Sequence, residues 1–405
     1  MGDQTERSHA PAGPLRGIKV LDFSIALTGP YATALMADQG AHVVKVERPG
    51  IGDIARWVGV AVNGMSAFFL VCNRGKQSIV LDLAQPEAVE IALQLAAESD
   101  VIVENFRPGV MERIGLGYDA VRAVNPDVIY ASLSGFGSEG PYRDRSAYDT
   151  AIQAYGGFAA NQSDPDDGMP VFLRQTAADK VTSLFACQAI TAALFARANG
   201  DGGQHVELSM TDAVVSFLWA DAAGNEVLLD ADGTQNSSFT KGFRPMQFED
   251  GWGIVVPTSD HDFAGMCKAL DVPGFDDPRI ATVQERVKHR DVLEPIMDMC
   301  YAQAANLTQA EATLRFDRER VPYSMILTPD ELTRDPHAVA IGLFVEDEHH
   351  VVGRTRVPRH PTRFRGTPAT LRNGTPALGE HTDAVLTSLG MADRVAELRE
   401  RGVVS

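Results

Sequence analysis

Short apolar segments alternate with amphipathic ones along the first third of the chain. Strands are predicted over residues 17–23, 42–46, 79–83, 101–104 and 128–133, because each is an apolar, β-branched run bounded by turn residues. Helices are predicted between them, over 31–39, 86–99 and 110–114. Strands that alternate with helices form a parallel sheet, so the sequence predicts an α/β, doubly wound (Rossmann-like) fold. Ligands bind such a sheet at the carboxyl ends of its strands.

A largely apolar helix is predicted to follow the polar segment 174–180. Its apolar residues recur at steps of three and four. The expected buried stripe consists of Val181, Phe185, Ala189, Ala192 and Ala196, and it is widened by Leu184, Ile190 and Leu194. Asp179 is expected at the N-cap of this helix, where backbone N–H groups and the helix dipole favour an ionised carboxylate. A carboxylate nucleophile needs that state. The alternative is that Asp179 only caps the helix, since Asp is a common N-cap residue.

The composition changes in the second half of the chain. Residues 222–241 are rich in Asn, Asp, Gly, Ser and Thr, which is typical of a linker. A smaller mixed α+β unit is expected after it, with a strand over 254–257 and helices over 262–270, 293–304 and 309–316. A β-rich piece over 344–357 and helices over 382–389 and 392–401 complete the chain.

Composition narrows the classes of protein that fit. The 405 residues are 44% hydrophobic and 22% charged, as in a globular protein, and they suffice for two domains. The first 14 residues are polar and the sequence lacks a run of about 18 apolar residues, so we expect a cytoplasmic protein without signal peptide or membrane span. The four cysteines and the histidines have no metal-site spacing, so no metal is expected and the cysteines are predicted to be buried free thiols.

The formal charge of −18 disfavours nucleic acids and anionic membranes as partners. Residues 45–76 nevertheless contain five cations, Lys45, Arg48, Arg56, Arg74 and Lys76, against two anions. This cluster is a candidate site for an anionic ligand, and scattered surface charge is the alternative interpretation. The loop after the first strand lacks G-x-G-x-x-G, so dinucleotide binding is not predicted.

Several ordered motifs of this sequence resemble the class III (family III, CaiB/BaiF-type) CoA-transferases, the group of formyl-CoA transferase and the carnitine CoA-transferases. They are Leu15–Phe23, Gly29–Pro30, Gly40–Pro49, Asn73–Ile79, Val103–Gly109, Tyr148–Asp149, Gly202–Glu207 and Leu378–Thr382. Together they extend over essentially the whole chain. A related enzyme of the same group is α-methylacyl-CoA racemase.

The resemblance implies a fold, an assembly and a set of site residues. It implies an arm over 1–14, a large α/β domain over 15–221, the linker 222–241, a small domain over 242–329, and a segment 330–405 that returns to complete the large domain. It also implies a homodimer of interlocked rings. The family's catalytic aspartate falls on Asp179, with support from Leu27, Thr28, Tyr148 and Asp149. Its coenzyme A contacts fall on Arg48, Leu81, Leu83, Asn105, Phe106, Arg107, Arg113 and Ser146.

The implied substrates are an acyl-CoA and a carboxylic acid acceptor, with no permanently bound cofactor. As a transferase, Asp179 would attack the thioester, with backbone N–H groups of residues 27–29 as oxyanion donors. A racemase needs a base on each face of the substrate carbon, and the racemase branch has His where this chain has Tyr148. Phenols, with an ordinary pKa near 10, are poor bases at neutral pH, so transfer is favoured. A non-catalytic CoA-binding protein is the second alternative. The glycine-rich lid of formyl-CoA transferase has no counterpart between residues 225 and 252.

Overall fold

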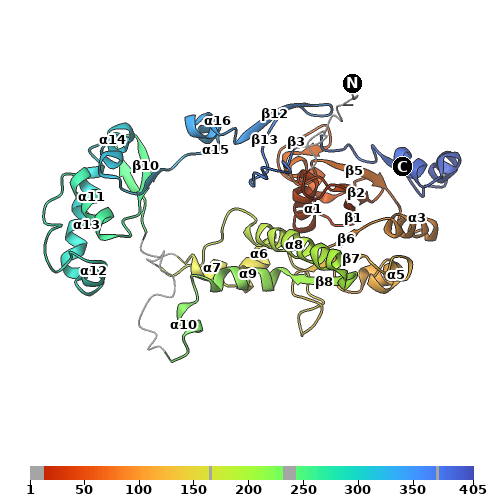
Figure 1. Cartoon of the computed structure of the whole chain (residues 1–405), viewed down its shortest axis with the longest axis horizontal. Coiled ribbons are helices and arrows are strands. Elements are labelled where there is room, and N and C mark those ends of the chain that lie inside the picture. The colour runs from red at the N-terminus through yellow and green to blue at the C-terminus, as the bar shows by residue number, and fades with distance from the viewer. Residues whose placement is uncertain (1–12, 164–166, 231–242, 371–373) are drawn as a thin grey trace, which may run out of the picture. The chain divides into compact units, whose positions relative to one another are not determined.

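A computed structural model describes residues 13–163, 167–230, 243–370 and 374–405 of the chain (Figure 1). These residues form two compact units. The first comprises the described residues of Met1–Leu229 and Gly342–Ser405, and the second those of Asp230–Ile341. The predicted arm lies outside the described residues up to residue 12, and so does the predicted linker from residue 231 to its end.

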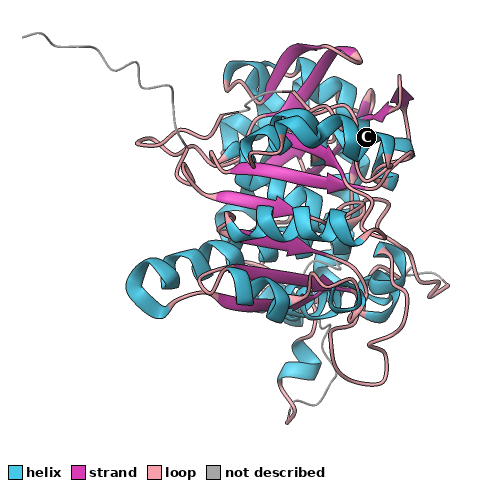
Figure 2. Ribbon diagram, turned by 90° about the vertical axis from the view of Figure 1, so that its right-hand side faces the viewer, coloured by secondary structure: helices cyan, strands magenta, loops and turns pink. Residues whose placement is uncertain are grey.

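The centre of the first unit is a six-stranded parallel sheet with the order β5-β2-β1-β6-β7-β8 (Figure 2). The strands are β1 Lys19–Asp22, β2 His42–Glu47, β5 Lys76–Val80, β6 Val101–Glu104, β7 Ile129–Ser134 and β8 Gln204–Ser209. The helices are α1 Thr28–Asp38, η1 Ile54–Trp57, α2 Ala67–Cys72, α3 Pro86–Ala97, α4 Val110–Arg113, α5 Tyr118–Val124, α6 Asp149–Tyr155, α7 Phe158–Asn161, α8 Ala177–Ala196, η2 Arg197–Asp201, α9 Met210–Trp219 and α10 Gly224–Val227. A small hairpin, β3 Ala61–Val62 with β4 Met65–Ser66, lies outside the sheet. The predicted α/β fold with a central parallel sheet is confirmed.

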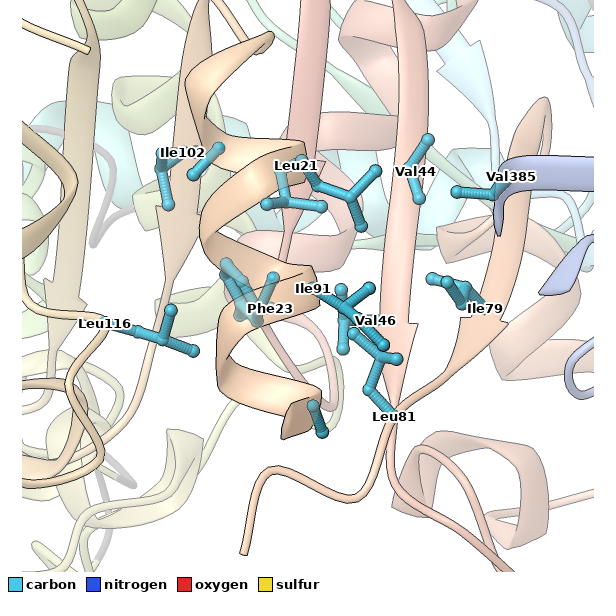
Figure 3. Close-up of a cluster of buried hydrophobic side chains, with 14 of the residues drawn as sticks. Leu21, Phe23, Val44, Val46, Ile79, Leu81, Ile91, Ile102, Leu116 and Val385 are labelled. Carbon is cyan, nitrogen blue, oxygen red and sulfur yellow. The ribbon is translucent and has the colours of Figure 1, made fainter. Parts of the chain in front are cut away.

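Successive residues of each central strand point to opposite faces of the sheet and enter two separate cores. Leu21, Val44 and Ile102 pack on one face, against α3, α5 and the C-terminal helices (Figure 3). Val20, Val43 and Val101 pack on the other face, against α1 and α8. Continuous apolar strands with helices on both faces are the signature of a buried parallel sheet.

The segment that returns after the second unit joins the edge of this sheet. It contains the hairpin β12 Phe344–His349 with β13 Gly353–Pro358, followed by α17 Thr382–Ser388, η4 Ala392–Arg394 and α18 Val395–Glu400. Val404 forms a bridge with Leu81, and the Thr382 hydroxyl accepts a hydrogen bond from the backbone N–H of Val80. Residues from both ends of the chain therefore build one core.

The predicted buried stripe of α8 is right for Ile190 and Leu194 but wrong for its other residues, which are half-buried or exposed. The buried residues of this helix are mostly small: Ala178, Thr182, Ser183, Ala186, Cys187, Ile190, Ala193 and Leu194. Helix α8 packs against α1, and small side chains allow two helices to approach closely. The larger Leu184 and Phe195 point away from this core and are 55% and 70% exposed. Within the described residues, α8 with η2 is also the one helix whose length and composition would allow a membrane span, but its packing is that of a core helix.

The second unit has its own core. A three-stranded antiparallel sheet of β9 Met246–Phe248, β10 Gly251–Val255 and β11 Tyr323–Met325 is accompanied by helices. These are α11 Asp260–Ala269, α12 Val283–Lys288, α13 Arg290–Ala304, α14 Gln309–Glu319, α15 Pro329–Arg334 and α16 Pro336–Ala340.

All four cysteines of the chain are free and buried, as predicted.

Candidate active site

A cavity of about 580 Å³ opens at the carboxyl ends of the central strands. We call it the strand-end cavity. It is lined by Phe23, Ile25, Ala26, Leu27, Thr28, Val46, Glu47, Arg48, Gly52, Asp53, Ile54, Leu81, Asp82, Leu83, Ala84, Asn105, Phe106, Leu133, Ser134, Gly135, Ala147, Tyr148, Asp179 and Met210. These residues come from the ends of β2 and β7, from the loops after β1, β2, β5, β6 and β7, and from the starts of η1, α1, α8 and α9. The cavity therefore lies where a doubly wound sheet binds its ligands.

Most of the predicted site residues meet at this cavity. Those that line it are Leu27, Thr28, Arg48, Leu81, Leu83, Asn105, Phe106, Tyr148 and Asp179. Arg107 instead lines a neighbouring cavity of about 570 Å³, which shares Phe106 and Ser134 with the first. Arg113, Ser146 and Asp149 are outside the lining of the strand-end cavity.

Asp179 is the third residue of α8, and Thr176 is the N-cap. The prediction that Asp179 caps the helix is therefore wrong. The Thr176 side chain makes no cap hydrogen bond either. The start of α8 is instead capped by Asp149, the first residue of helix α6. The Oδ1 atom of Asp149 accepts a hydrogen bond from the backbone N–H of Asp179 at 3.0 Å. Two segments 30 residues apart in sequence are joined in this way at the start of α8.

The carboxyl group of Asp179 is partly buried, and its Oδ1 accepts a hydrogen bond from the hydroxyl of Thr28. Burial raises the pKa of Asp179 from 3.8 to about 6. This value is the net result of four effects: burial and the negative charge of Asp149 raise the pKa, whereas the Thr28 hydrogen bond and the charge of Lys180 lower it. The expectation that the surroundings of Asp179 lower its pKa and so favour its ionised form is therefore wrong in direction, since desolvation outweighs the donors. The result is a more basic carboxylate at the wall of a cavity.

Side chains from other segments hold the loop Ser24–Leu27, which connects β1 to α1. The Asn105 amide pairs with the backbone of Ile25, since it accepts from the Ile25 N–H and donates to the Ile25 carbonyl, each at 2.8 Å. Asp53 accepts the N–H of Ala26 at 2.9 Å, and Ala26 has a left-handed φ of 63°. A non-glycine residue holds this conformation only when its surroundings fix it. The loop that contributes Leu27 and Thr28 is therefore rigidly held.

The predicted basic cluster is mostly a set of buried ion pairs rather than an anion site. Lys45 pairs with Asp53 at 2.9 Å, Arg56 with Glu47 at 2.6 Å, Arg74 with Asp38 at 2.7 Å and Lys76 with Asp22 at 2.9 Å. Charges that are already paired and buried are not available to a ligand. Arg48 differs, because it lines the strand-end cavity and its Nε–H donates to the Gly52 carbonyl at 3.1 Å.

A fully buried glutamine at this site has no signal in the sequence pattern. Gln153 in α6 is 0% exposed and donates from its amide nitrogen to Asp149 Oδ2 at 2.6 Å. It lies one turn after the Tyr148–Asp149 motif on a seven-residue helix, and glutamine at such a position is usually exposed. Hydrogen-bonded polar residues inside a core can be recognised only once their partners are known.

Comparison with known proteins gives consistent results over almost the full chain. The profile of CoA-transferase family III matches residues 15–382. The chain is 33% identical to the human succinyl-CoA:glutarate CoA-transferase over 399 residues, which cover 96% of this chain and 90% of that protein. It is 31% identical to the acetyl-CoA:oxalate CoA-transferase of Acetobacter aceti, over 88% of this chain and 90% of that one. The crystal structure of a CaiB/BaiF family protein from Brucella suis superposes with a TM-score of 0.80 at 30% identity, covering 93% of this chain and 100% of that one.

Proposed function

The chain belongs to CoA-transferase family III and is an enzyme that transfers coenzyme A, and we propose that the transfer proceeds through a covalent intermediate on Asp179. The observation that supports this most directly is the placement of the Asp179 carboxyl group. It lines the strand-end cavity, accepts one hydroxyl hydrogen bond, and has a pKa raised to about 6 by burial. Above that pH it is ionised yet poorly solvated, which makes a carboxylate a better nucleophile.

In the first half-reaction, a carboxylate oxygen of Asp179 attacks the carbonyl carbon of the donor acyl-CoA. The carbon–sulfur bond breaks, the CoA thiolate leaves, and a mixed anhydride remains on the enzyme. The thiolate then attacks the aspartyl carbonyl of the anhydride, which releases the donor acid and leaves an aspartyl-CoA thioester. In the second half-reaction, the acceptor carboxylate attacks the aspartyl-CoA thioester, which expels the CoA thiolate and forms a second mixed anhydride. The thiolate then attacks the acyl carbonyl of the acceptor, so that the acyl-CoA of the acceptor is released and the Asp179 carboxylate is regenerated.

Each of these steps passes through a tetrahedral oxyanion that needs hydrogen-bond donors. Helix α1 begins at Thr28, and its N-cap residue Leu27 makes no side-chain cap hydrogen bond. The first N–H groups of a helix have no partner within it and lie at the positive end of the helix dipole. The N–H groups of Thr28 and Gly29 are therefore the candidates for oxyanion stabilisation, beside the hydroxyl that contacts Asp179.

The CoA contacts remain proposals. Arg48 suits a phosphate of CoA, because a guanidinium group binds phosphate oxygens in a fork geometry. Leu81, Leu83 and Phe106 offer an apolar wall for the adenine or the pantetheine arm. The acids that the enzyme exchanges are not defined by these contacts. The names of the relatives above include glutarate and oxalate, so the acceptor within this family varies.

We also propose the homodimer that the resemblance implies. Supporting it, Leu184 and Phe195 of α8 and Phe217 of α9 are exposed by 55%, 70% and 56%. Large apolar side chains on neighbouring helices of one unit form the kind of surface that a partner subunit covers. Sedimentation equilibrium at micromolar concentration would measure the stoichiometry, and a monomer would refute this part.

The mechanism is tested by trapping the acyl-enzyme. The wild-type protein is incubated with a panel of acyl-CoAs and free acids, with hydroxylamine added, and the peptide containing Asp179 is analysed by mass spectrometry. Transfer together with an aspartyl hydroxamate at Asp179 is the expected result. Asp179→Asn is the control, and we expect it to bind CoA but to form no hydroxamate. Exchange of the α-hydrogen with deuterated water without transfer would indicate a racemase, and CoA binding without either reaction would indicate a binding protein.

A further inference from the structure

We propose that Gln153 is a positioning residue for acyl transfer, which holds Asp149 and the segment Leu173–Gln175 so that the Asp179 carboxyl group faces the strand-end cavity. This inference rests on the proposed function of Asp179. Gln153 itself lies behind the cavity wall, so it acts through Asp149 and the backbone rather than on substrate.

The Gln153 amide is surrounded by groups that fix its orientation. Its nitrogen faces three acceptors: Asp149 Oδ2 at 2.6 Å and the carbonyl oxygens of Leu173 and Gln175 at 3.2 Å each. Its oxygen faces one donor, the backbone N–H of Leu173 at 2.9 Å. An amide supplies two N–H donors and one acceptor oxygen on opposite sides, and this arrangement uses both sides. An ionised carboxylate in its place would face three acceptors with no donor to offer.

The same amide joins two parts of the chain that must be aligned for chemistry. Asp149 Oδ2 binds Gln153, and Asp149 Oδ1 binds the N–H of Asp179. The Gln175 carbonyl accepts the N–H of Ala177, the first residue of α8, at 2.7 Å. Gln153 thus fixes the start of α8 in two ways: through Asp149, which accepts the N–H of Asp179, and through the Gln175 carbonyl in the turn before the helix. Because α8 lacks a cap from its own N-cap side chain, this support has no substitute at Thr176.

A small loss of alignment at Asp179 has a large kinetic effect. Nucleophilic attack requires the reacting atoms about 3–3.5 Å apart with correct orientation, and a misplacement of about 1 Å can reduce a rate about a hundredfold. A variant that releases Asp149 and the 173–175 segment should therefore lower kcat at least about tenfold. The KM for acyl-CoA should change little, because Arg48 and the apolar wall lie on other segments.

Gln153→Glu distinguishes positioning from a general packing role through pH. In its protonated form the introduced carboxyl group matches the glutamine amide in shape and donates one O–H to Asp149, whereas in its ionised form it repels Asp149. Asp149 on α6 is the charged side chain that contacts Gln153, and Asp149 and Lys180 are the charged groups that act on the Asp179 carboxyl group. The ratio of wild-type to variant kcat is expected to be small near pH 6 and to rise at least about tenfold by pH 8.5. Circular dichroism of the variant over the same pH range is expected to stay unchanged, because unfolding caused by a buried charge would also raise this ratio.

The experiment measures kcat and KM of acyl transfer for the wild type, Gln153→Glu and the matched control Gln94→Glu between pH 6 and 8.5. Gln94 is an exposed residue of α3, so its substitution adds the same charge away from the site. A pH-independent ratio, or the same ratio in the control, overturns the inference. If Gln153→Glu does not fold, the uncharged Gln153→Met replaces it, and a kcat within twofold of wild type overturns the inference. Hydroxylamine trapping in the wild-type sample separates this outcome from failure of the proposed function, because it reports on Asp179 alone.

Discussion

Replacing Asp179 by Asn should abolish transfer and at the same time stabilise the folded protein. Burial raises the pKa of Asp179 in the native state from 3.8 to about 6. Between these two values the native state binds more protons than the unfolded state, so the free energy of unfolding falls as pH rises through this window. Above about pH 6 the carboxylate is ionised in both states, and its destabilising contribution reaches its full size. Asparagine removes the charge and keeps an oxygen that can accept the Thr28 hydrogen bond.

The magnitude follows from the two pKa values. At about 1.36 kcal/mol for each pKa unit, the difference between 3.8 and about 6 corresponds to about 3 kcal/mol at pH 8. Roughly half of this destabilisation is present at pH 5, because Asp179 is then mostly protonated in the native state but ionised in the unfolded one. The advantage of the Asn variant should therefore be about 3 kcal/mol at pH 8 and about half as large at pH 5.

Urea unfolding of both proteins at pH 5, 6.5 and 8, followed by circular dichroism at constant ionic strength, measures this difference. Asp144→Asn serves as the control, because its side chain is 86% exposed and reports the general effect of removing a surface carboxylate. An Asp179→Asn protein that is no more stable than wild type at pH 8 would refute the reasoning. So would an advantage that does not grow between pH 5 and pH 8.

Three other substitutions test the surroundings of the site. Asp22→Asn leaves the buried Lys76 without its charged partner, so the free energy of unfolding should fall by about 3–5 kcal/mol. Urea unfolding at pH 7 measures this change, and a loss below about 1 kcal/mol would contradict the prediction. Thr28→Val removes the hydroxyl that stabilises ionised Asp179, so its pKa should rise further and the acid limb of the kcat profile should move to higher pH. An unmoved limb between pH 5 and 9 would argue against that contact. Arg48→Gln should raise the KM for acyl-CoA about tenfold with little change in kcat, as for loss of one hydrogen bond to a charged group, and an unchanged KM would exclude Arg48 from the CoA site.

The sheet was predictable because its strands are continuous apolar runs. β6 and the start of β2 agree with the predicted strands to the residue. Helix α1 ends at Asp38, one residue before the predicted end, and Gly40 follows its C-cap with a φ of 99°. β5 was misplaced, since it begins at Lys76 rather than Ile79. Lys76 is 1% exposed, and its burial depends on Asp22, which lies 54 positions earlier in the chain. A local pattern assigns a lysine to the surface, because only a distant partner can make its burial favourable.

The chemistry of the site was less predictable than the fold. The choice of Asp179 came from the family resemblance, since its spacing alone favours a helix cap. Its protonation behaviour was predicted in the wrong direction, because burial by the surrounding fold dominates it. Of the three groups that adjust the pKa further, Thr28 and Asp149 are 151 and 30 residues away in sequence, and Lys180 is the neighbouring residue. The interpretation of the basic cluster as an anion site was wrong for a related reason. A count of charges along a segment cannot reveal which of them are already paired with carboxylates.

The buried Asp22 and the partly buried Asp179 of the first unit show how the surroundings decide the state of one residue type. Burial raises the pKa of Asp22, yet the charges of Lys76 and Lys45 and the Ser24 hydroxyl outweigh it and lower the pKa to about 2. Its carboxylate accepts bonds from the backbone and hydroxyl of Ser24, from Thr33 and from Lys76. Among the described residues, Thr28 is the side chain that donates to the Asp179 carboxylate.

The contrast matters because the same connection, from β1 to α1, contacts both carboxylates. Asp22 ends β1, and through Ser24 it anchors the loop whose other end presents Thr28 to Asp179. A fully satisfied carboxylate stabilises the fold but is a weak nucleophile, since its lone pairs are occupied and its pKa is low. An undersatisfied one destabilises the fold but stays reactive. The network at Asp22 therefore supplies rigidity where no chemistry is needed, and the cavity wall can hold Asp179 in a state that would be unfavourable without that support.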